Sequence, residues 1–430
     1  MMKLASLFAF LLLCVGSLSP ANTILRPPDP AAPLAERWNW ARAEAPRQVR
    51  GQYWIAWTVQ RQMKETEIVG SVYSDRARIT LKEILNGVAE PQPSLQEEAK
   101  SALERMSSSE KKAAQMVTRD LAILIKISPG GEATTSGVSL TNLHFDTGGL
   151  PIAWLGKAEQ QESLALVVKI YDQVRTSECK QELIAAAALH SLPDQVIPFL
   201  QKLFTEEKPD QLRGQAGFWL ANQDNPAALK TLLNQLPKEH SGEVIDEAMA
   251  GIHSTESPTA VDIFAQLASQ GNPHLLREQA IFWLGQTESD RAAKLLQHVI
   301  AEDPDRELRK KAVFSLSQMP EALSLSPMIQ LARGNAPEEI RKEAVFWLSQ
   351  IASKKVASIL KDTVENDGSF EIQKQALFAL SEIEDSSGLE ELIHIATTSS
   401  NAALRKEAIF CLGQSSDPRA REALLKMLEE

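Results

Sequence analysis

Apolar residues recur at a fixed interval along the C-terminal part of the chain. The stretch RKEAVFWLSQ begins at Arg341, and related stretches begin at Arg277, Arg309, Gln373 and Arg405, each 32 residues from the next. When the first residue of each copy is position zero, Ala at position three and Leu at position seven fall on one face of an α-helix. A constant interval of this length is typical of a solenoid of stacked helical units.

Weaker copies begin at Gln181, Arg213 and Ile245, so eight copies are in register. A second apolar series stands at position nineteen: Leu200, Leu232, Phe264, Leu296, Met328, Leu360, Leu392 and Leu424. Small residues stand four positions before it, and turn formers such as Asp224-Asn225-Pro226 separate the two series. The pattern therefore predicts a mainly α region, residues 161–430, of about eight 32-residue helical hairpins.

The repeated helix resembles that of HEAT repeats, in particular the short bacterial kind also found in phycobilisome lyases. The family pattern V-R-x-x-A-x-x-x-L-G is matched by LREQAIFWLG from Leu276 and LRKEAIFCLG from Leu404. The resemblance covers about Ser163 to Glu430 and implies a right-handed α-solenoid whose Arg-bearing helices line the concave surface. The family's turn Asp, six residues before the Arg, is present at Asp303, whereas Asp367 precedes a Gln.

A different pattern precedes the repeats, in residues 49–160. Short β-branched or aromatic runs bounded by turn formers predict strands at residues 52–60, 68–73, 121–128 and 138–145. Residues 79–85 suit a helix, and the charged, Ser-rich residues 90–112 suit a connection. We expect a small α+β domain with a mostly antiparallel sheet that covers the exposed end of the first repeat.

The N-terminus has the features of a secretory signal peptide. A basic start at Lys3 precedes an apolar run from Leu4 to Val15, and Ala21 ends a plausible cleavage site, so residues 1–21 are expected to be removed. The exported protein would be periplasmic or extracellular. Cys14 raises the alternative of a lipoprotein, although the residue before it is not small.

Residues 22–48 are rich in Pro and Ala and are expected to form an arm, with Trp38 and Trp40 packed on the following domain. No other stretch is long and apolar enough to predict a membrane span. The net charge of −11 argues against nucleic-acid binding, which needs a concentrated basic surface. Cys179 and Cys411 stand seven intervals apart, too far along a solenoid for a disulfide within the chain.

The residues do not predict a catalytic constellation, a metal site or a cofactor. HEAT-fold hydroxylases that bind iron use His-Glu pairs, and this chain has no His-Glu dipeptide. Its seven His residues lack metal-ligand spacing, and no G-x-S-x-G is present.

The repeated helix carries aromatic residues where a polar residue is expected. Position five is Phe in six copies: Phe218, Phe282, Phe314, Phe346, Phe378 and Phe410. Position one is Lys in the last four copies (Lys310, Lys342, Lys374 and Lys406), and position nine is Gln in four copies (Gln286, Gln318, Gln350 and Gln414). These positions share the helix face opposite the core, so stacked repeats would form a Phe ladder between rows of Lys and Gln.

An exposed apolar stripe usually marks an interaction site, and aromatic residues beside cations are common anchors. Alternatively, the Phe rings pack against one another and on the Lys stems. Trp219, Trp283 and Trp347, at position six, are expected to pack between repeats.

We therefore predict a monomeric, non-enzymatic scaffold or adaptor of the cell envelope that binds another protein through its concave face. Two alternatives remain: an enzyme or enzyme subunit with its site in the α+β domain, and an envelope structural protein that binds glycan.

Overall fold

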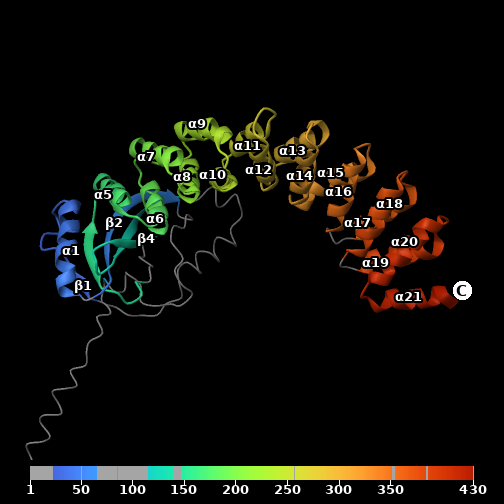
Figure 1. The fold of residues 1–430 in the computed structure, drawn as a ribbon, viewed down its shortest axis with the longest axis horizontal. Helices are drawn as coiled ribbons and strands as arrows, with labels where there is room; N and C mark the ends of the chain where they lie inside the picture. The colour runs from blue at the N-terminus through green and yellow to red at the C-terminus, as the bar shows by residue number, and fades with distance from the viewer. Residues whose placement is uncertain are drawn as a thin grey trace, which may run out of the picture. The chain divides into compact units, whose positions relative to one another are not determined.

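The computed structural model describes residues 23–49, 51–64, 85, 115–139, 147–255, 257–350, 354–383 and 386–429. The chain divides into two compact units, Met1–Ala228 and Leu229–Glu430. Figure 1 shows the labelled helices and strands, coloured along the chain from blue to red. The first unit holds the sheet together with the first helices of the repeats, so the boundary predicted at residue 160 lies inside it. The second unit contains only helices among its described residues.

A five-stranded sheet with strand order β1-β5-β2-β3-β4 forms the centre of the first unit. Its strands are β1 Ile24–Leu25, β2 Tyr53–Lys64, β3 Met116–Ile127, β4 Ala133–Ser139 and β5 Ile152–Lys157. β2, β3 and β4 pair antiparallel, whereas β5 lies parallel to both β1 and β2. The predicted α+β domain is confirmed. Its sheet is mixed, because β5 inserts beside β2 with parallel pairing.

The strands predicted at residues 52–60 and 121–128 correspond to β2 and β3. The strand predicted at 138–145 overlaps only the end of β4, and its remainder lies outside the described residues. The predicted strand at 68–73 and connection at 90–112 also lie outside them, as does the predicted helix at 79–85 apart from Leu85.

The arm predicted for residues 22–48 contains helix α1, Leu34–Gln48, which packs on β2 and β5. The Ala-rich segment after Pro33 has a high helix propensity, and Pro residues are concentrated before it. Trp38 is 4% exposed and meets the Trp57 ring edge to face, with 6.1 Å between centroids. Buried Arg37 donates to the backbone oxygens of Leu155 and Lys157. Trp38 therefore packs as predicted, and Trp40 is half-buried.

The first repeat is joined to the sheet through the edge strand β4. Helix α5, Gln160–Gln173, packs on α1 and β2, and helix α6, Ser177–Ala188, packs on β4. The Glu182 carboxylate accepts a hydrogen bond from the Ser136 N–H at 2.6 Å and others from the hydroxyls of Thr135 and Ser136. Covering an edge strand in this way satisfies its polar groups.

The repeats continue as helical hairpins. In the first unit they are α7 Pro193–Glu206 and α8 Asp210–Ala221, and α9 Pro226–Gln235 contains the boundary between the units. In the second unit they are η1 Leu236–Lys238, α10 Gly242–Ser254, α11 Ala260–Ala268, α12 His274–Gly285, α13 Asp290–Glu302, α14 Arg306–Ser317, α15 Glu321–Arg333, α16 Glu338–Ser349, α17 Lys354–Asn366, α18 Phe370–Ser381, α19 Ser386–Thr398, α20 Ala402–Gln414 and α21 Pro418–Glu429.

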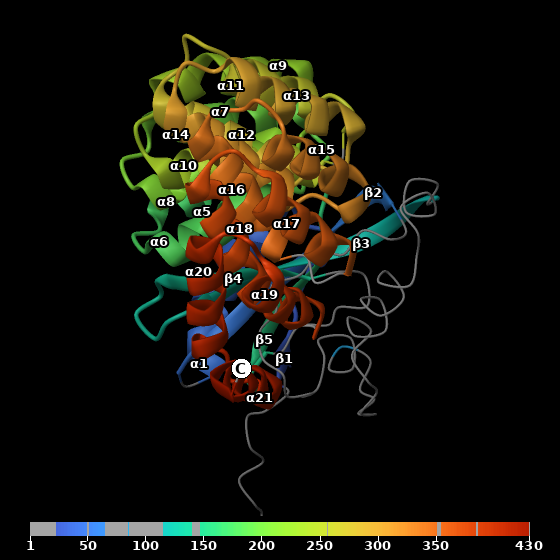
Figure 2. The ribbon, with the colours of Figure 1, turned by 90° about the vertical axis from the view of Figure 1, so that its right-hand side faces the viewer.

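Within the second unit, the even-numbered helices adjoin one another in one layer and the odd-numbered helices in the other (Figure 2). The predicted core face of the even-numbered helices is right. Ala280, Ala312, Ala344, Ala376 and Ala408 at position three have no exposed surface, and the Leu residues at position seven are at most 1% exposed. Alanine at this contact lets helices pack closely because it has little side-chain volume.

Buried or partly buried ion pairs link consecutive repeats. Arg277 pairs with Asp303 and donates from Nε to the Ala268 carbonyl at 3.1 Å. Arg341 likewise pairs with Asp367 and donates to the Ala332 carbonyl at 3.2 Å. Each Asp thus contacts the Arg of the preceding repeat. Asp367 therefore needs Arg341 as its partner and does not need an Arg at position 373, where its own repeat begins with Gln.

Candidate binding face on the repeat helices

The Phe residues at position five differ in exposure along the second unit. Phe282, Phe314 and Phe346 are half-buried, whereas Phe378 is 47% and Phe410 is 61% exposed. Phe218, in the first unit, is half-buried. The predicted ladder is therefore a packed row of rings on α12, α14 and α16 and an exposed pair on α18 and α20. We call the surface of these five helices the ladder face.

Trp side chains account for the packed part of the ladder. Trp347 contacts its neighbour Phe346 at 5.0 Å and Phe314 of the preceding repeat at 4.9 Å between centroids. Trp283 stacks on Phe264 at 6.5 Å and donates a hydrogen bond from its indole to Asp246 at 2.9 Å. These Trp residues pack between repeats, as the sequence predicted. Position six is Ala379 and Cys411 in the last two repeats, so Phe378 and Phe410 lack such a partner.

Ion pairs hold most of the Lys residues at position one. Lys310 lies 3.4 Å from Glu307, Lys342 lies 3.0 Å from Glu338, and Lys374 lies 3.4 Å from Glu407 of the next repeat. The hydrogen bond to Glu338 holds the pKa of Lys342 above its usual value. Lys406 is exposed and forms no ion pair with a described residue. The predicted Lys row is thus a row of local pairs with one unpaired cation near Phe410.

The Gln residues at position nine contribute little to a common surface. Gln318 and Gln350 are exposed, and each donates to the hydroxyl of the Ser beside it, at 3.2 and 3.1 Å. Gln414 is exposed and Gln286 is half-buried.

Lys311, at position two, is a feature of the ladder face that the sequence analysis missed. Its ammonium lies 5.3 Å from the centroid of Phe282 and 5.5 Å from that of Phe314, within cation–π range. It also lies 3.6 Å from Glu278. The sequence analysis singled out the neighbouring Lys310, at position one. The structure shows that Lys311 is the residue whose ammonium lies near two Phe rings.

A shallow depression of about 390 Å³ opens beside Lys311, between α10, α12 and α14. Glu243 and Asp246 line one side, and Phe282 and Lys311 line the other. Such a mixture of acidic, aromatic and basic groups suits contact with polar and apolar side chains of another protein.

The first unit contains a buried Ser–His contact that sequence reasoning also missed. Ser163 accepts a hydrogen bond from the Trp57 indole at 2.7 Å and contacts His190 Nε2 at 2.9 Å. Ser163 is 0% and His190 is 3% exposed, so neither group is accessible to a substrate. The contact joins β2, α5 and the turn that follows α6, and its residues stand too far apart in the sequence to predict it.

Two buried cysteines, Cys179 and Cys411, are the remaining candidate nucleophiles among the described residues. Burial raises the pKa of the Cys179 thiol to about 12 and also raises that of Cys411, which leaves both thiols poor nucleophiles. Among the described residues, no group of three or more His, Cys, Asp or Glu side chains could hold a metal ion. No helix in the described part of the chain is both long and apolar enough to cross a membrane.

The family model of HEAT repeats matches residues 229–317, 261–349 and 358–430. Together with the stacked hairpins, these matches show HEAT-like repeats within residues 229–349 and 358–430. They extend the resemblance seen in the Arg-bearing helices to whole hairpins of the second unit.

Several solved structures are similar to the chain at low identity. Human deoxyhypusine hydroxylase is 14% identical with a TM-score of 0.25, over 59% of this chain and 96% of that one. The Escherichia coli protein YibA is 18% identical with a TM-score of 0.30, over 60% and 96%. The complex of CpcE and CpcF of phycocyanin lyase from Nostoc sp. PCC7120 is 14% identical with a TM-score of 0.27, over 54% and 94%. At these values the similarity supports no functional argument. No curated protein sequence matches the chain.

Proposed function

We propose that the protein is a non-enzymatic scaffold that binds another protein through the ladder face. HEAT-repeat solenoids commonly bind proteins, and the exposed rings of Phe378 and Phe410 are the observation that carries the proposal. Large, solvent-exposed aromatic side chains on a rigid surface are frequent anchors of protein interfaces. The contact would be centred on α18 and α20, where position six carries no Trp.

Charge on this part of the face favours a partner with both apolar and acidic groups. Lys406 is exposed one turn from Phe410 on the same helix and lacks an ion pair with a described residue. The Lys residues of the preceding repeats already pair with Glu, so they add little net attraction. An acidic side chain placed beside an apolar anchor would contact Lys406 and the Phe410 ring together.

A double substitution, Phe378→Ser with Phe410→Ser, tests this proposal. Proteins captured from the envelope fraction by the unchanged chain would be identified and purified, and their affinity for the variant measured by titration calorimetry. We expect binding at least about tenfold weaker, since the loss of one anchor typically exceeds 1 kcal/mol. Melting temperature should change little because both rings are exposed.

Leu428→Ser is the matched control. Leu428 is 84% exposed and belongs to α21, not to one of the helices that carry the row of Phe rings. Full affinity for the double variant, or an equal loss in the Leu428 variant, would reject the ladder face as the binding surface.

We also propose that the protein is exported to the periplasm or cell exterior. The proposal is supported by the basic start and apolar run of residues 1–21. N-terminal sequencing of cell fractions is expected to find a chain that begins near Asn22; Met1 on a cytosolic chain would contradict it.

A further inference from the structure

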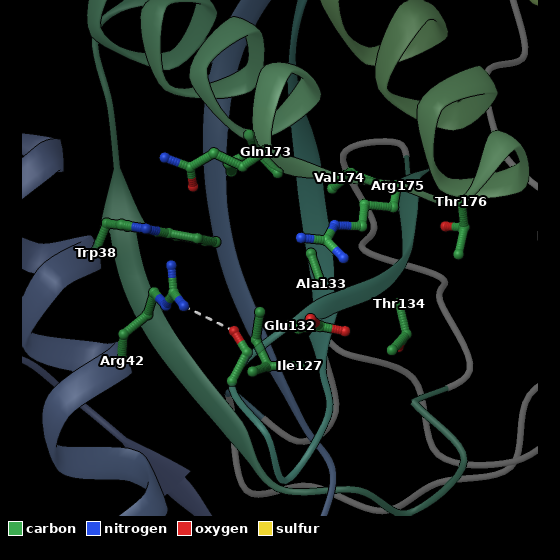
Figure 3. A pocket seen from close by; sticks show the side chains of 12 residues that line it. Trp38, Arg42, Ile127, Glu132, Ala133, Thr134, Gln173, Val174, Arg175 and Thr176 are labelled. Carbon is green, nitrogen blue, oxygen red and sulfur yellow. Dashed lines mark hydrogen bonds between the residues drawn. The ribbon is translucent and has the colours of Figure 1, made fainter.

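A small pocket in the first unit carries chemistry that the scaffold function does not use. It has a volume of about 170 Å³ and lies between α1, the β3–β4 turn and the link from α5 to α6 (Figure 3). Its volume is below the 300–1,000 Å³ of pockets for drug-sized ligands, so it suits a single small group or the end of a longer chain.

Two guanidinium groups reach this pocket from opposite sides, Arg42 from α1 and Arg175 from the α5–α6 link (Figure 3). Arg42 donates from Nη2 to the Gly131 carbonyl at 2.7 Å, which uses one of its five N–H donors and fixes its position. Arg175 is exposed and forms no hydrogen bond or ion pair with a described residue. Donors therefore remain available on both sides of the pocket.

The frame around the two Arg side chains is rigid. Gly131 has φ +81°, a conformation that favours glycine, and the turn is closed by a hydrogen bond from its N–H to the Ser128 carbonyl at 2.9 Å. Trp38 forms an apolar wall that is held in place by its contact with Trp57. A ligand would therefore meet preformed donors and a fixed aromatic wall, which limits the entropy lost on binding.

The N-terminal end of helix α6 lies at the pocket. Thr176, its N-cap residue, lines the pocket and makes no side-chain capping hydrogen bond. The first N–H groups of a helix lack partners within the helix and favour negative charge nearby. Glu132 is the one acidic side chain in the lining, against two Arg, so the described lining carries a net positive charge.

We infer that this pocket binds an organic anion, a carboxylate or phosphate attached to a short apolar group. The planar guanidinium groups of Arg42 and Arg175 match the paired oxygens of either anion. The Trp38 ring and the side chains of Ile127, Ile170 and Val174 would contact the apolar part. A peptide with a free C-terminal carboxylate is one source of such a group, and a phosphate ester is the other.

Titration calorimetry on the full chain tests the inference with three probes: an acetylated peptide that ends in a free leucine carboxylate, the same peptide as an amide, and inorganic phosphate. Saturable binding of the free acid without binding of the amide supports the site and identifies a carboxylate source. Saturable binding of phosphate supports the site and identifies a phosphate source. No saturable binding of either anion overturns the inference.

Three variants locate the binding in this pocket. Arg175→Gln is expected to weaken the anion about tenfold or more, because a charge-assisted pair is lost. Glu132→Gln should strengthen it several-fold by removing repulsion. Lys169→Gln, an equal change in charge at an exposed position of α5 outside the lining, should leave affinity unchanged. Because exposed Arg175 forms no hydrogen bond or ion pair with a described residue, the variant should fold, and unaltered binding in it would reject the site.

Discussion

At the residue scale, the hydroxyl of Ser163 is the centre of the polar network in the first unit. The indole N–H of Trp57 can only donate, so the Ser163 hydroxyl accepts this hydrogen bond. The hydroxyl can then donate its own hydrogen to one further acceptor. His190 Nδ1 lies 2.9 Å from the Ala186 carbonyl, so Nδ1 must carry the ring proton and Nε2 must accept from Ser163. Every polar atom of the network is then satisfied only while His190 is neutral.

Burial lowers the pKa of His190 to about 4, although the Ala186 and Ala187 carbonyls act in the opposite direction. Because the folded pKa lies below the unfolded value of about 6.5, the unfolded chain binds a proton first as pH falls. We expect the contribution of His190 to the free energy of unfolding to be constant above pH 6.5. It should fall by roughly 3 kcal/mol between pH 6.5 and 4. Urea unfolding of the first unit, followed by Trp fluorescence across this range, measures the loss.

His190→Asn provides the control, since an amide has similar hydrogen-bonding groups but does not titrate in this range. The variant is expected to be less stable at pH 7 and to lack the loss between pH 6.5 and 4. An unchanged pH slope in the variant would show that other groups cause the acid sensitivity.

At the element scale, helices α12 and α14 approach each other closely at Gly285. A Cβ added to Gly285 on α12 would lie 2.5 Å from the backbone oxygen of Ser315 on α14. At the same repeat position on α20, a Cβ added to Gly413 would meet nothing within 4 Å. The two glycines therefore look equivalent in the sequence but differ in what packs on them.

Gly285→Ala is expected to destabilise the second unit by about 1 to 3 kcal/mol, because α12 and α14 must separate. Gly413→Ala should be neutral or stabilise by up to about 1 kcal/mol, since alanine is the better helix former and no neighbour is displaced. Calorimetric melting of the two variants compares them directly. Equal losses of stability would show that the close approach of α12 and α14 is not what requires glycine.

Most helices and their buried faces could be predicted from the sequence, because regularly spaced apolar residues define the face of a helix that is buried. Ala344 and Leu348 are buried as their spacing predicted, and the two long strands β2 and β3 follow from their β-branched and aromatic runs. β5 was not predicted, because its parallel pairing with β2 depends on contacts distant in sequence. The pairing of Lys374 had a similar cause, because its partner Glu407 stands on the next repeat, whereas Lys310 and Lys342 pair with a Glu of their own helix.

At the scale of the whole molecule, the same repeated helix motif has different surroundings in different copies. Phe346 is followed by Trp347 and is half-buried, whereas Phe410 is followed by Cys411 and is 61% exposed. The period predicted the stacked hairpins, but exposure depends on what the neighbouring copies carry at position six. A binding role for every Phe therefore could not be separated from packing by the sequence alone.

This difference predicts unequal stability effects for the same change in two copies. Phe346→Ser should lower the free energy of unfolding of the second unit by about 1 to 3 kcal/mol, less than the 3 to 5 for a fully buried Phe, because its ring is half-buried against Trp347. Phe410→Ser should cost about 0.5 kcal/mol or less, as is usual for exposed side chains. Urea denaturation followed by circular dichroism measures both variants under one condition. Equal losses would mean that Phe410 packs in solution, and the exposed anchor on which the scaffold proposal rests would then be absent.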